Sequence, residues 1–450
     1  MSSSLRQSVR GLVQRFEIDR AVLYAMSARG WQFVAGPVTL WLIADHFSAD
    51  VRGYFYTFGS VLAIQLFFEL GLHTILVNQV SHQWASLRLN DDGSITGDPN
   101  AAARLASLIR FVDRWYTVCA VLFAVCCGIG GHWFFSGKQS EIPWQYPWLC
   151  LVIMAGVSFR LTPCFTILEG CGQVREVNRM RFSQAVCGNL AVWVAILMNG
   201  QLWACVVAAV VRLVWEFILV GTSFRRIRTG LAAFPADSDI NWKENIWPLQ
   251  WRIAIQSVSL WFAMHLFTIV TFEFHGEAAG GRMGMTWSIA TAIQAAAMAW
   301  VATRIPVFGK LIAENDFGAL DRLFKRMAVF STTFIAVSSS AVVAAVLYLN
   351  SIESRYAVCL LEPLPTAFIF LGIVVNHFIY CQAIYVRAHR TEPFLYLTTS
   401  VNLMIGLSVW MLGERYGALG AISGWLTLSA LLYLPLHTML WVRLRRDLHS

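Results

Sequence analysis

Residues 146–170 read YPWLCLVIMAGVSFRLTPCFTILEG, an apolar stretch with one arginine, Arg160, near its middle. About 20 predominantly apolar residues are enough for an α-helix to cross the hydrocarbon core of a bilayer. A guanidinium inside such a helix is costly to bury, and intramembrane charges by default mark a functional polar path. The stretch therefore predicts a transmembrane helix that carries a candidate functional residue. The apolar stretch at 202–224 repeats the pattern with Arg212.

The composition of the whole chain is typical of a protein that crosses a membrane many times. Of its 450 residues, 57% are hydrophobic and 13% are charged, whereas about 25% are charged in a soluble domain. The mean hydropathy is +0.57. No basic segment followed by a short apolar core and a cleavage site stands at the N-terminus, so we expect no cleaved signal peptide. The predicted fold class is an all-α polytopic membrane protein.

Apolar stretches of spanning length predict about twelve transmembrane helices. Their approximate ranges are 24–46, 53–79, 114–135, 146–170, 182–200, 202–224, 249–274, 283–303, 327–349, 363–385, 393–412 and 417–441. The 34 lysines and arginines test this count, because cytoplasmic loops carry an excess of them. With the N-terminus in the cytoplasm, every inner segment holds at least two basic residues. The outer loops hold at most one each, namely Arg52, Lys138, Arg282, Arg355 and Arg415.

This alternation places both termini in the cytoplasm and gives the net charge of +8 a role in topology and lipid contact. Nucleic acid is therefore not an expected partner. The predicted organisation is an amphipathic N-terminal segment, a six-helix bundle, a linker, a second six-helix bundle and a tail, at 1–23, 24–224, 225–248, 249–441 and 442–450. A solvated tail explains the first of these segments equally well.

Two features bear on the internal organisation. Arg29 is followed by LWL at 40–42, and Arg252 is followed by LWF at 260–262, which indicates a duplicated bundle of the kind found in transporters. The ten cysteines show no metal-ligand spacing, and most lie in apolar stretches as small packing residues. Cys150 and Cys359 lie nearer the outer face and could pair, which the sequence alone does not decide. We expect no metal and no other cofactor.

Three segments carry a family resemblance. They are RGYFYTFGSVLAIQLFFELGLHTILVNQVS at 52–81, ILEGCGQVREVNRMRF at 167–182, and the stretch from AAGGRMGMTW to DRLFKR at 278–326. Together they resemble the polysaccharide-transporter branch of the MOP superfamily, the Wzx-like flippases of lipid-linked oligosaccharides such as O-antigen precursors. The resemblance covers essentially the whole chain. Its motifs are diffuse, and none is a catalytic signature.

The resemblance implies a MATE-like fold of twelve helices in two bundles around a V-shaped cavity. By alternating access, such a protein would carry an undecaprenyl-diphosphate-linked oligosaccharide across a bacterial inner membrane. Besides the lipid-linked oligosaccharide and membrane lipids, its partners could include a polysaccharide polymerase or chain-length proteins. The family's cavity is commonly lined by basic residues. By position, the residues of this chain that could line such a cavity are the arginines inside the predicted spans, Arg29, Arg160, Arg212 and Arg252.

Arginine suits a diphosphate because its planar fork binds phosphate with two hydrogen bonds and stays charged. Arg160 and Arg212 lie near mid-span, whereas Arg29 and Arg252 lie nearer the inner ends, where their side chains could also reach the headgroups. A structural ion pair with Glu216, four residues on, is an alternative role for Arg212.

Two acidic residues and one histidine are candidates for ion pairing or for coupling transport to an ion. Glu69 or Glu216 could pair with Arg160 across helices, and Glu69 could instead be a proton or cation site. His265 lies mid-span and could titrate, although a hydrogen-bonded packing role is the commoner one. The second half is otherwise nearly uncharged in the middle of its spans.

Three other functions compete with a flippase. A MATE-type cation-coupled exporter of small molecules would have the same spans but an acidic cavity, whereas this chain offers arginines. A membrane polysaccharide polymerase or glycosyltransferase normally needs a sizeable outer loop with catalytic groups, and the predicted outer loops are short. We therefore expect a transporter and not an enzyme. A scaffold that transports nothing is a third alternative.

Overall fold

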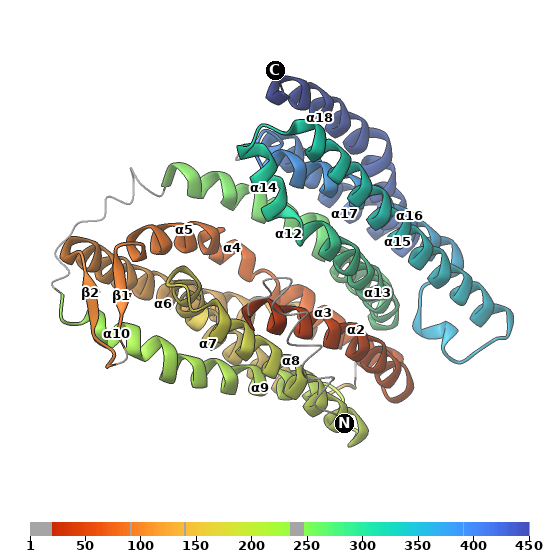
Figure 1. The fold of residues 1–450 in the computed structure, drawn as a ribbon. Coiled ribbons are helices and arrows are strands. Elements are labelled where there is room, and N and C mark those ends of the chain that lie inside the picture. Colours follow the sequence, from red (N-terminus) through yellow and green to blue (C-terminus); the bar gives the residue numbers. More distant parts are fainter. Residues whose placement is uncertain (1–19, 91, 139–140, 235–246, 390, 450) are drawn as a thin grey trace, which may run out of the picture. The chain divides into compact units, whose positions relative to one another are not determined.

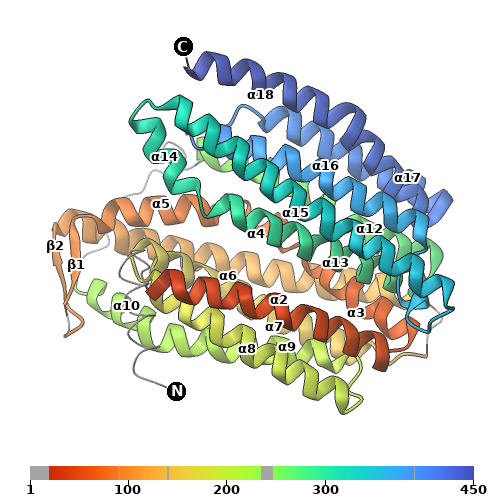
Figure 2. The ribbon, with the colours of Figure 1, turned by 45° about the vertical axis from the view of Figure 1, so that its right-hand side comes forward.

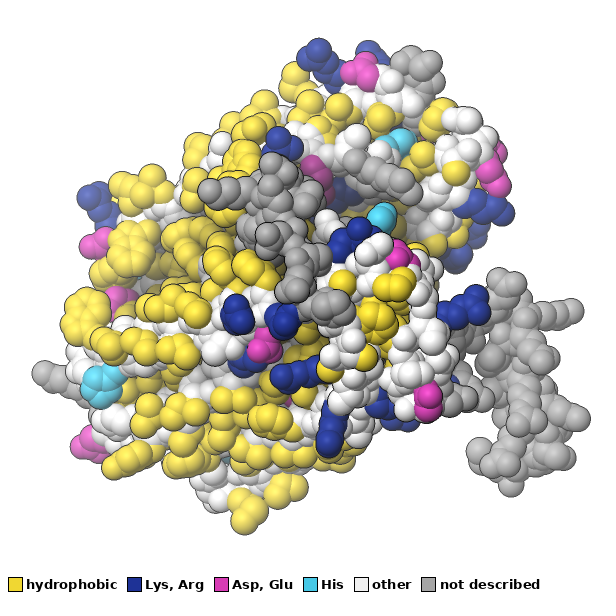
Figure 3. Space-filling model, turned by 90° about the vertical axis from the view of Figure 1, so that its left-hand side faces the viewer, with side chains coloured by type: hydrophobic (Ala, Val, Ile, Leu, Met, Phe, Trp, Pro, Cys, Tyr) yellow, Lys and Arg dark blue, Asp and Glu magenta, His cyan; other side chains and the backbone are white. Residues whose placement is uncertain are grey.

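The computed structural model describes residues 20–449 except 91, 139–140, 235–246 and 390, and these residues are almost entirely helical (Figure 1). By packing, the chain divides into two compact units, residues 1–42 with 65–254 and residues 43–64 with 255–450. Nine helical runs in the described part are long and apolar enough to cross a membrane. Hydrophobic side chains also cover much of the face shown in Figure 3. The predicted class, an all-α polytopic membrane protein, is confirmed.

The first unit consists of helices and one short hairpin. Its elements are α2 (Arg20–His46, except its last turn), α4 (Gln65–Glu69), α5 (Leu72–Trp84), β1 (Leu87–Leu89), β2 (Ile95–Gly97), α6 (Pro99–Ser136), α7 (Gln145–Gly170), α8 (Val174–Leu197), α9 (Trp203–Leu219), the π-helical turn η1 (Val220–Phe224), α10 (Arg225–Leu231) and the start of α12. The antiparallel strands place Leu87 opposite Gly97. Aromatic rings join α6 to α7, where Phe123 and Phe159 are buried with ring centroids 5.8 Å apart.

The second unit contains the remaining helices. They are α3 (Ala49–Leu62), α12 (Trp247–His275, from Ile255 onward), α13 (Glu277–Ala302), α14 (Ile305–Ala313), α15 (Phe317–Ser351), the 3-10 turn η2 (Ala357–Cys359), α16 (Pro363–Arg387), α17 (Leu395–Thr427), the π-helical turn η3 (Leu428–Tyr433) and α18 (Leu434–His449). In Figure 2, α15, α16 and α18 run alongside one another. The rings of Phe267 and Trp287 stack at 4.5 Å in the core of this unit.

The predicted span at 53–79 is wrong as a single helix, because the chain is broken there into α3, α4 and α5. Leu70 and Gly71 have φ angles of 51° and 65°, in the left-handed region that interrupts a helix. A Cβ on Gly71 would also lie 2.2 Å from Ile253 Cγ2 of α12. Glycine is therefore required here both for its backbone conformation and for the close approach. Broken helices at membrane depth are common in transporters.

The predicted spans at 393–412 and 417–441 form one continuous run, α17 through α18, with a tight reversal inside it. Gly417 has φ 64° and ψ −148°, a conformation that essentially only glycine adopts. Cβ atoms built on Gly420 and Gly424 would lie 2.2 Å from Leu412 O and 2.1 Å from Ser408 Oγ. The helical segments before and after Gly417 therefore lie in close contact, and small residues make that contact possible.

The predicted bundles, 24–224 and 249–441, differ from the two compact units in one segment, because packing assigns residues 43–64 to the second unit. The division of the chain into two six-helix bundles stays a prediction. Residues 1–19 of the N-terminal segment and residues 235–246 of the linker lie outside the described residues, whereas α2 begins at Arg20 and α10 occupies the start of the linker. All ten cysteines are described, each as a free thiol. Cys150 and Cys359 lie in different units, so their pairing stays a prediction.

Candidate functional site

Arg160 of α7 is paired with an aspartate of the neighbouring helix α6. One of its terminal guanidinium nitrogens donates to Asp113 Oδ1. The Arg160 side chain is 28% exposed and that of Asp113 is 42% exposed, so the pair reaches the surface of the first unit. The sequence offered Glu69 or Glu216 as a possible partner of Arg160. The partner in the structure is instead Asp113, because α6 extends well beyond its apolar stretch and brings Asp113 alongside α7.

A second polar group lies on α9. Arg212 Nε donates to Glu216 Oε1 at 2.8 Å, one turn along the same helix, as their spacing allows. Ser158 Oγ of α7 donates to the same oxygen at 2.9 Å. Glu216 is 3% exposed, and within the described part of the chain its second oxygen, Oε2, is buried without a hydrogen-bond partner. The carboxylate is therefore buried and held from two helices, with one oxygen able to accept a further donor.

Helix α7 thus links two polar groups that lie on its two neighbours. Ser158 and Arg160 are two residues apart on α7, and they bond to α9 and α6 respectively. Side chains two positions apart on a helix point in different directions, which explains why one helix serves both groups. The result is a band of charged side chains across α6, α7 and α9, which lies near the middle of the apolar stretches of α7 and α9 and at the edge of that of α6.

Arg29 and Arg252 lie at the surface of the first unit. Both side chains are exposed, and the Arg252 guanidinium lies 5.6 Å from the ring of Trp251. Among the described residues no salt bridge joins either arginine to a carboxylate. Both are therefore accessible to an anion or to lipid headgroups.

Glu69 does not pair with an arginine among the described residues. Its neighbour His73 instead lies 3.4 Å, Nε2 to Oε2, from Glu169 at the end of α7, and Glu169 Oε1 also accepts from Arg181 of α8 at 2.8 Å. This cluster ties the end of α7 to α5 and α8. Glu69 is half-buried in the short helix α4, next to the break in the chain.

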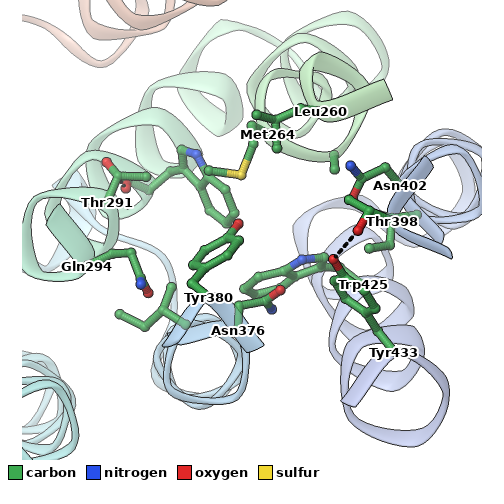
Figure 4. A pocket seen from close by; sticks show the side chains of 14 residues that line it. Leu260, Met264, Thr291, Gln294, Asn376, Tyr380, Thr398, Asn402, Trp425 and Tyr433 are labelled. Carbon is green, nitrogen blue, oxygen red and sulfur yellow. Dashed lines mark hydrogen bonds between the residues drawn. The ribbon is translucent and has the colours of Figure 1, made fainter. Parts of the chain in front are cut away.

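The second unit has an uncharged polar cavity of about 50 Å³ among α12, α13, α16 and α17 (Figure 4). Several amide and hydroxyl side chains line it, among them Thr291, Gln294, Asn376, Tyr380, Thr398, Asn402 and Tyr433. Asn376 Nδ2 donates to Ser429 Oγ at 3.2 Å, and the hydroxyls of Thr398 and Tyr433 are 3.0 Å apart. A cavity of this size holds a few water molecules but no drug-sized ligand.

A hydrogen-bonded chain leads away from this cavity. Gln294 Nε2 lies 3.2 Å from His377 Nδ1, and His377 Nε2 lies 3.0 Å from Ser331 Oγ. Gln294, Asn376 and His377 were recognisable as polar residues of apolar spans, but their partners on other helices were not. The candidate residue His265 is half-buried, with its ring 6.3 Å from that of Trp261.

No protein-family model matches the sequence, and no curated protein matches it in sequence. Solved structures do match in fold. An inward-facing multidrug resistance transporter of the MATE family and MOP superfamily has a TM-score of 0.58 at 13% identity, covering 95% of this chain and 96% of that one. The lipid II flippase MurJ, in an inward closed conformation, has a TM-score of 0.61 at 12% identity, covering 93% and 87%.

A third structure is a MOP superfamily transporter from Pyrococcus furiosus whose binding pocket is described as reversed in polarity. It has a TM-score of 0.50 at 13% identity and covers 96% of both chains. Identities this low show the fold alone. These neighbours are transporters and a flippase rather than enzymes. The chain is therefore a multi-pass membrane protein with the MATE-like fold of the MOP-superfamily transporters.

Proposed function

We propose that the protein is a flippase that moves an undecaprenyl-diphosphate-linked oligosaccharide from the inner to the outer leaflet of a bacterial inner membrane. It would do so by alternating access, in the synthesis of a surface polysaccharide such as O-antigen, capsule or exopolysaccharide. Both termini would be cytoplasmic. The sequence resemblance to Wzx-like flippases and the fold shared with a lipid II flippase support this proposal.

The main observation in favour of a flippase is the exposure of Arg212. This side chain is 50% exposed although it lies in the middle of the apolar run Trp203–Leu231. A charged side chain at that depth that faced hydrocarbon would cost several kcal/mol or more, so an exposed arginine there favours a water-filled polar surface. Arg160 and Asp113 are also partly exposed, on the neighbouring helices. A diphosphate needs such a basic, hydrated route.

The proposed roles of the arginines follow from their depth. Arg29 and Arg252 lie nearer the inner ends of their spans and would meet the arriving diphosphate first. Arg160 and Arg212 would then hold it deeper in the membrane, where a charge-assisted bond to phosphate is stronger than in water. Their carboxylate partners would keep the guanidiniums in place when no cargo is bound.

Glu216 is the best placed candidate for coupling transport to an ion. It is buried, and its Oε2 has no hydrogen-bond partner within the described residues. A proton or cation at that oxygen would loosen the hold of Glu216 on Arg212 and so alter the affinity of the arginine for phosphate. Glu69 and His265 stay candidates for the same role.

A MATE-type exporter of small molecules is the second candidate, favoured by the TM-score of 0.58 with a multidrug transporter of that family. One observation favours the flippase over it. The first unit contains arginines, Arg160 and Arg212, in the middle of predicted spans, which suits an anion rather than a cation.

A flip assay in proteoliposomes tests the proposal. The probe is a fluorescent undecaprenyl-diphosphate oligosaccharide, and wild type is compared with Arg160→Ala and Arg212→Ala. Loss of a charge-assisted bond to phosphate is worth about 1.5–3 kcal/mol, so we expect each variant to flip roughly tenfold more slowly or worse. Arg415→Ala, at an exposed arginine outside the predicted spans, is the matched control and is expected to flip normally.

Two other outcomes of the flip assay would contradict the proposal or its arginine-lined route. Normal flipping by both variants would make Arg160 and Arg212 structural and would remove the basis for an arginine-lined route. A wild-type protein that flips nothing but takes up an organic cation would favour the exporter instead.

A further inference from the structure

A groove on the second unit lies among α15, α16 and α18. Helix α16 packs against both α15 and α18, so these two helices flank it. The groove has a cavity volume of about 530 Å³ and is lined by Phe378 of α16, by Trp441 and Arg445 of α18, and by one side of α15. Its size is within the range of about 300–1,000 Å³ that is typical of ligand sites. We call it the α15 groove.

The residues that α15 contributes change in character along its length. Arg322 and Lys325 line the groove near the start of the helix, and Val329, Thr332 and Thr333 line it further along. These positions recur at helical spacing, so they form one stripe along the helix. From Arg322 to Thr333 the stripe extends about 16 Å, close to the depth of one leaflet of the roughly 30 Å hydrocarbon core.

The charges at the basic end of the groove are not cancelled by the one carboxylate that lines it. Asp321 already accepts from Arg445, whose Nε lies 3.1 Å from Oδ1, and from the Tyr385 hydroxyl at 2.7 Å. Arg322 and Lys325 are exposed, and within the described residues no salt bridge joins either of them to an acidic side chain. The basic end is therefore electrostatically suited to an anion.

We propose that the α15 groove binds an anionic membrane phospholipid. Its phosphate would lie at Arg322 and Lys325, beside Arg445, and one acyl chain would follow Val329 toward Phe378. The combination of a basic end and an apolar course as long as one leaflet matches an amphiphile with a negative headgroup. A soluble anion would leave the apolar part of the groove unused. This lipid site would be present whatever cargo the protein carries.

The leaflet follows from the predicted topology. The segment that precedes α15 is basic and was assigned to the cytoplasmic side, and α18 ends on the same side because Arg445 pairs with Asp321. The basic end of the groove would therefore lie at the cytoplasmic headgroup region, where anionic lipids attract juxtamembrane lysines and arginines.

Native mass spectrometry of the full-length protein in detergent tests the site. Phosphatidylglycerol and phosphatidylcholine are titrated into delipidated wild type and into the double variant Arg322→Gln/Lys325→Gln. We expect wild type to retain phosphatidylglycerol preferentially, and the double variant to bind it about tenfold more weakly. The matched control, Arg225→Gln/Arg228→Gln, removes the same charge from exposed positions of α10, outside the α15 groove, and should bind as wild type does. Equal loss in both double variants would mean general surface attraction and would overturn the proposal.

A second pair of variants tests the apolar part. Val329→Trp fills the groove, whereas Val337→Trp alters an exposed position of α15 that does not line it. We expect only Val329→Trp to lower phosphatidylglycerol binding. Inorganic phosphate at millimolar concentration should not displace the lipid from wild type. Displacement by phosphate, or unchanged binding to Val329→Trp, would show a simple anion site and contradict the lipid assignment.

Discussion

Arg212 and Glu216 form an ion pair on one turn of α9, yet the Arg212 side chain is 50% exposed and that of Glu216 is 4% exposed. Ser158 of α7 donates to the same Glu216 oxygen that accepts from Arg212. The carboxylate is therefore fixed by hydrogen bonds from two helices. The Arg212 guanidinium, in contrast, is bonded through Nε, and its side chain is half exposed. In this arrangement the buried carboxylate keeps its position, and the exposed guanidinium can exchange its partner for an arriving anion.

The bond from Ser158 to Glu216 should contribute measurably to stability. A hydrogen bond to a buried charged group is worth about 1.5–3 kcal/mol, so Ser158→Ala should lower the free energy of unfolding by roughly that amount. Thr162→Ala is the matched control on the same helix, because the Thr162 hydroxyl donates to the backbone oxygen of Ser158 and such bonds contribute little. Equilibrium unfolding in mixed micelles, followed by circular dichroism, measures both. Equal losses would contradict the prediction.

The pair of Arg160 and Asp113 should behave differently. Both side chains are partly exposed, and such ion pairs typically contribute less than about 1 kcal/mol. Asp113→Asn should therefore leave stability nearly unchanged and retain much of the flipping rate, whereas Arg160→Ala should slow flipping roughly tenfold or more. Both quantities can be measured on one preparation in the micelle and proteoliposome assays. If Asp113→Asn flips as poorly as Arg160→Ala, then the ion pair, and not the arginine alone, is required.

The sequence was sufficient for features that depend on local pattern. Apolar length predicted most of the long helices, and a spacing of four residues predicted that Arg212 and Glu216 could pair. The reversal at Gly417 also fell at the predicted boundary between two spans. Each of these rests on residues close together in the chain, where helix geometry alone decides which side chains meet.

Features that depend on packing between helices were not predictable in this way. Asp113 lies outside the apolar stretch of α6, so the hydropathy pattern predicted a loop there. Its pairing with Arg160 was therefore not predicted. The break in the second predicted span was missed because Leu70, an apolar and non-glycine residue, takes a positive φ there. The polar cavity of the second unit needs four helices to converge, which no local pattern encodes.

Gly417 should not tolerate a side chain. Its φ of 64° and ψ of −148° are essentially restricted to glycine, and forcing another residue into such a region costs about 1–3 kcal/mol. Gly417→Ala should therefore lower the thermal unfolding midpoint in detergent. Gly309→Ala is the control, because Gly309 lies inside α14 and a Cβ there would meet nothing within 4 Å. It should be neutral or slightly stabilising, since alanine favours a helix. A Gly417→Ala protein as stable as wild type would show that the turn can relax.

Gly53 and Gly281 should be needed for the contact between α3 and α13. A Cβ on Gly53 would lie 2.1 Å from the backbone oxygen of Glu277, and one on Gly281 would lie 2.9 Å from the backbone nitrogen of Gly53. Backbone atoms cannot move aside as a flexible side chain can, so Gly53→Ala must separate the two helices. Overpacking of this kind costs about 1–3 kcal/mol. Small residues are what allow helices to approach so closely in a membrane.

Gly59→Ala on the same helix is the matched control for Gly53→Ala, because a Cβ at Gly59 meets nothing within 4 Å. We expect Gly53→Ala to lower the unfolding free energy in micelles and Gly59→Ala to leave it unchanged or raise it slightly. Helix α3 precedes α4 and the break at Leu70 and Gly71. We therefore expect a displaced α3 also to slow flipping in proteoliposomes. A Gly53→Ala protein with wild-type stability and rate would mean that α3 and α13 are not held together at this glycine.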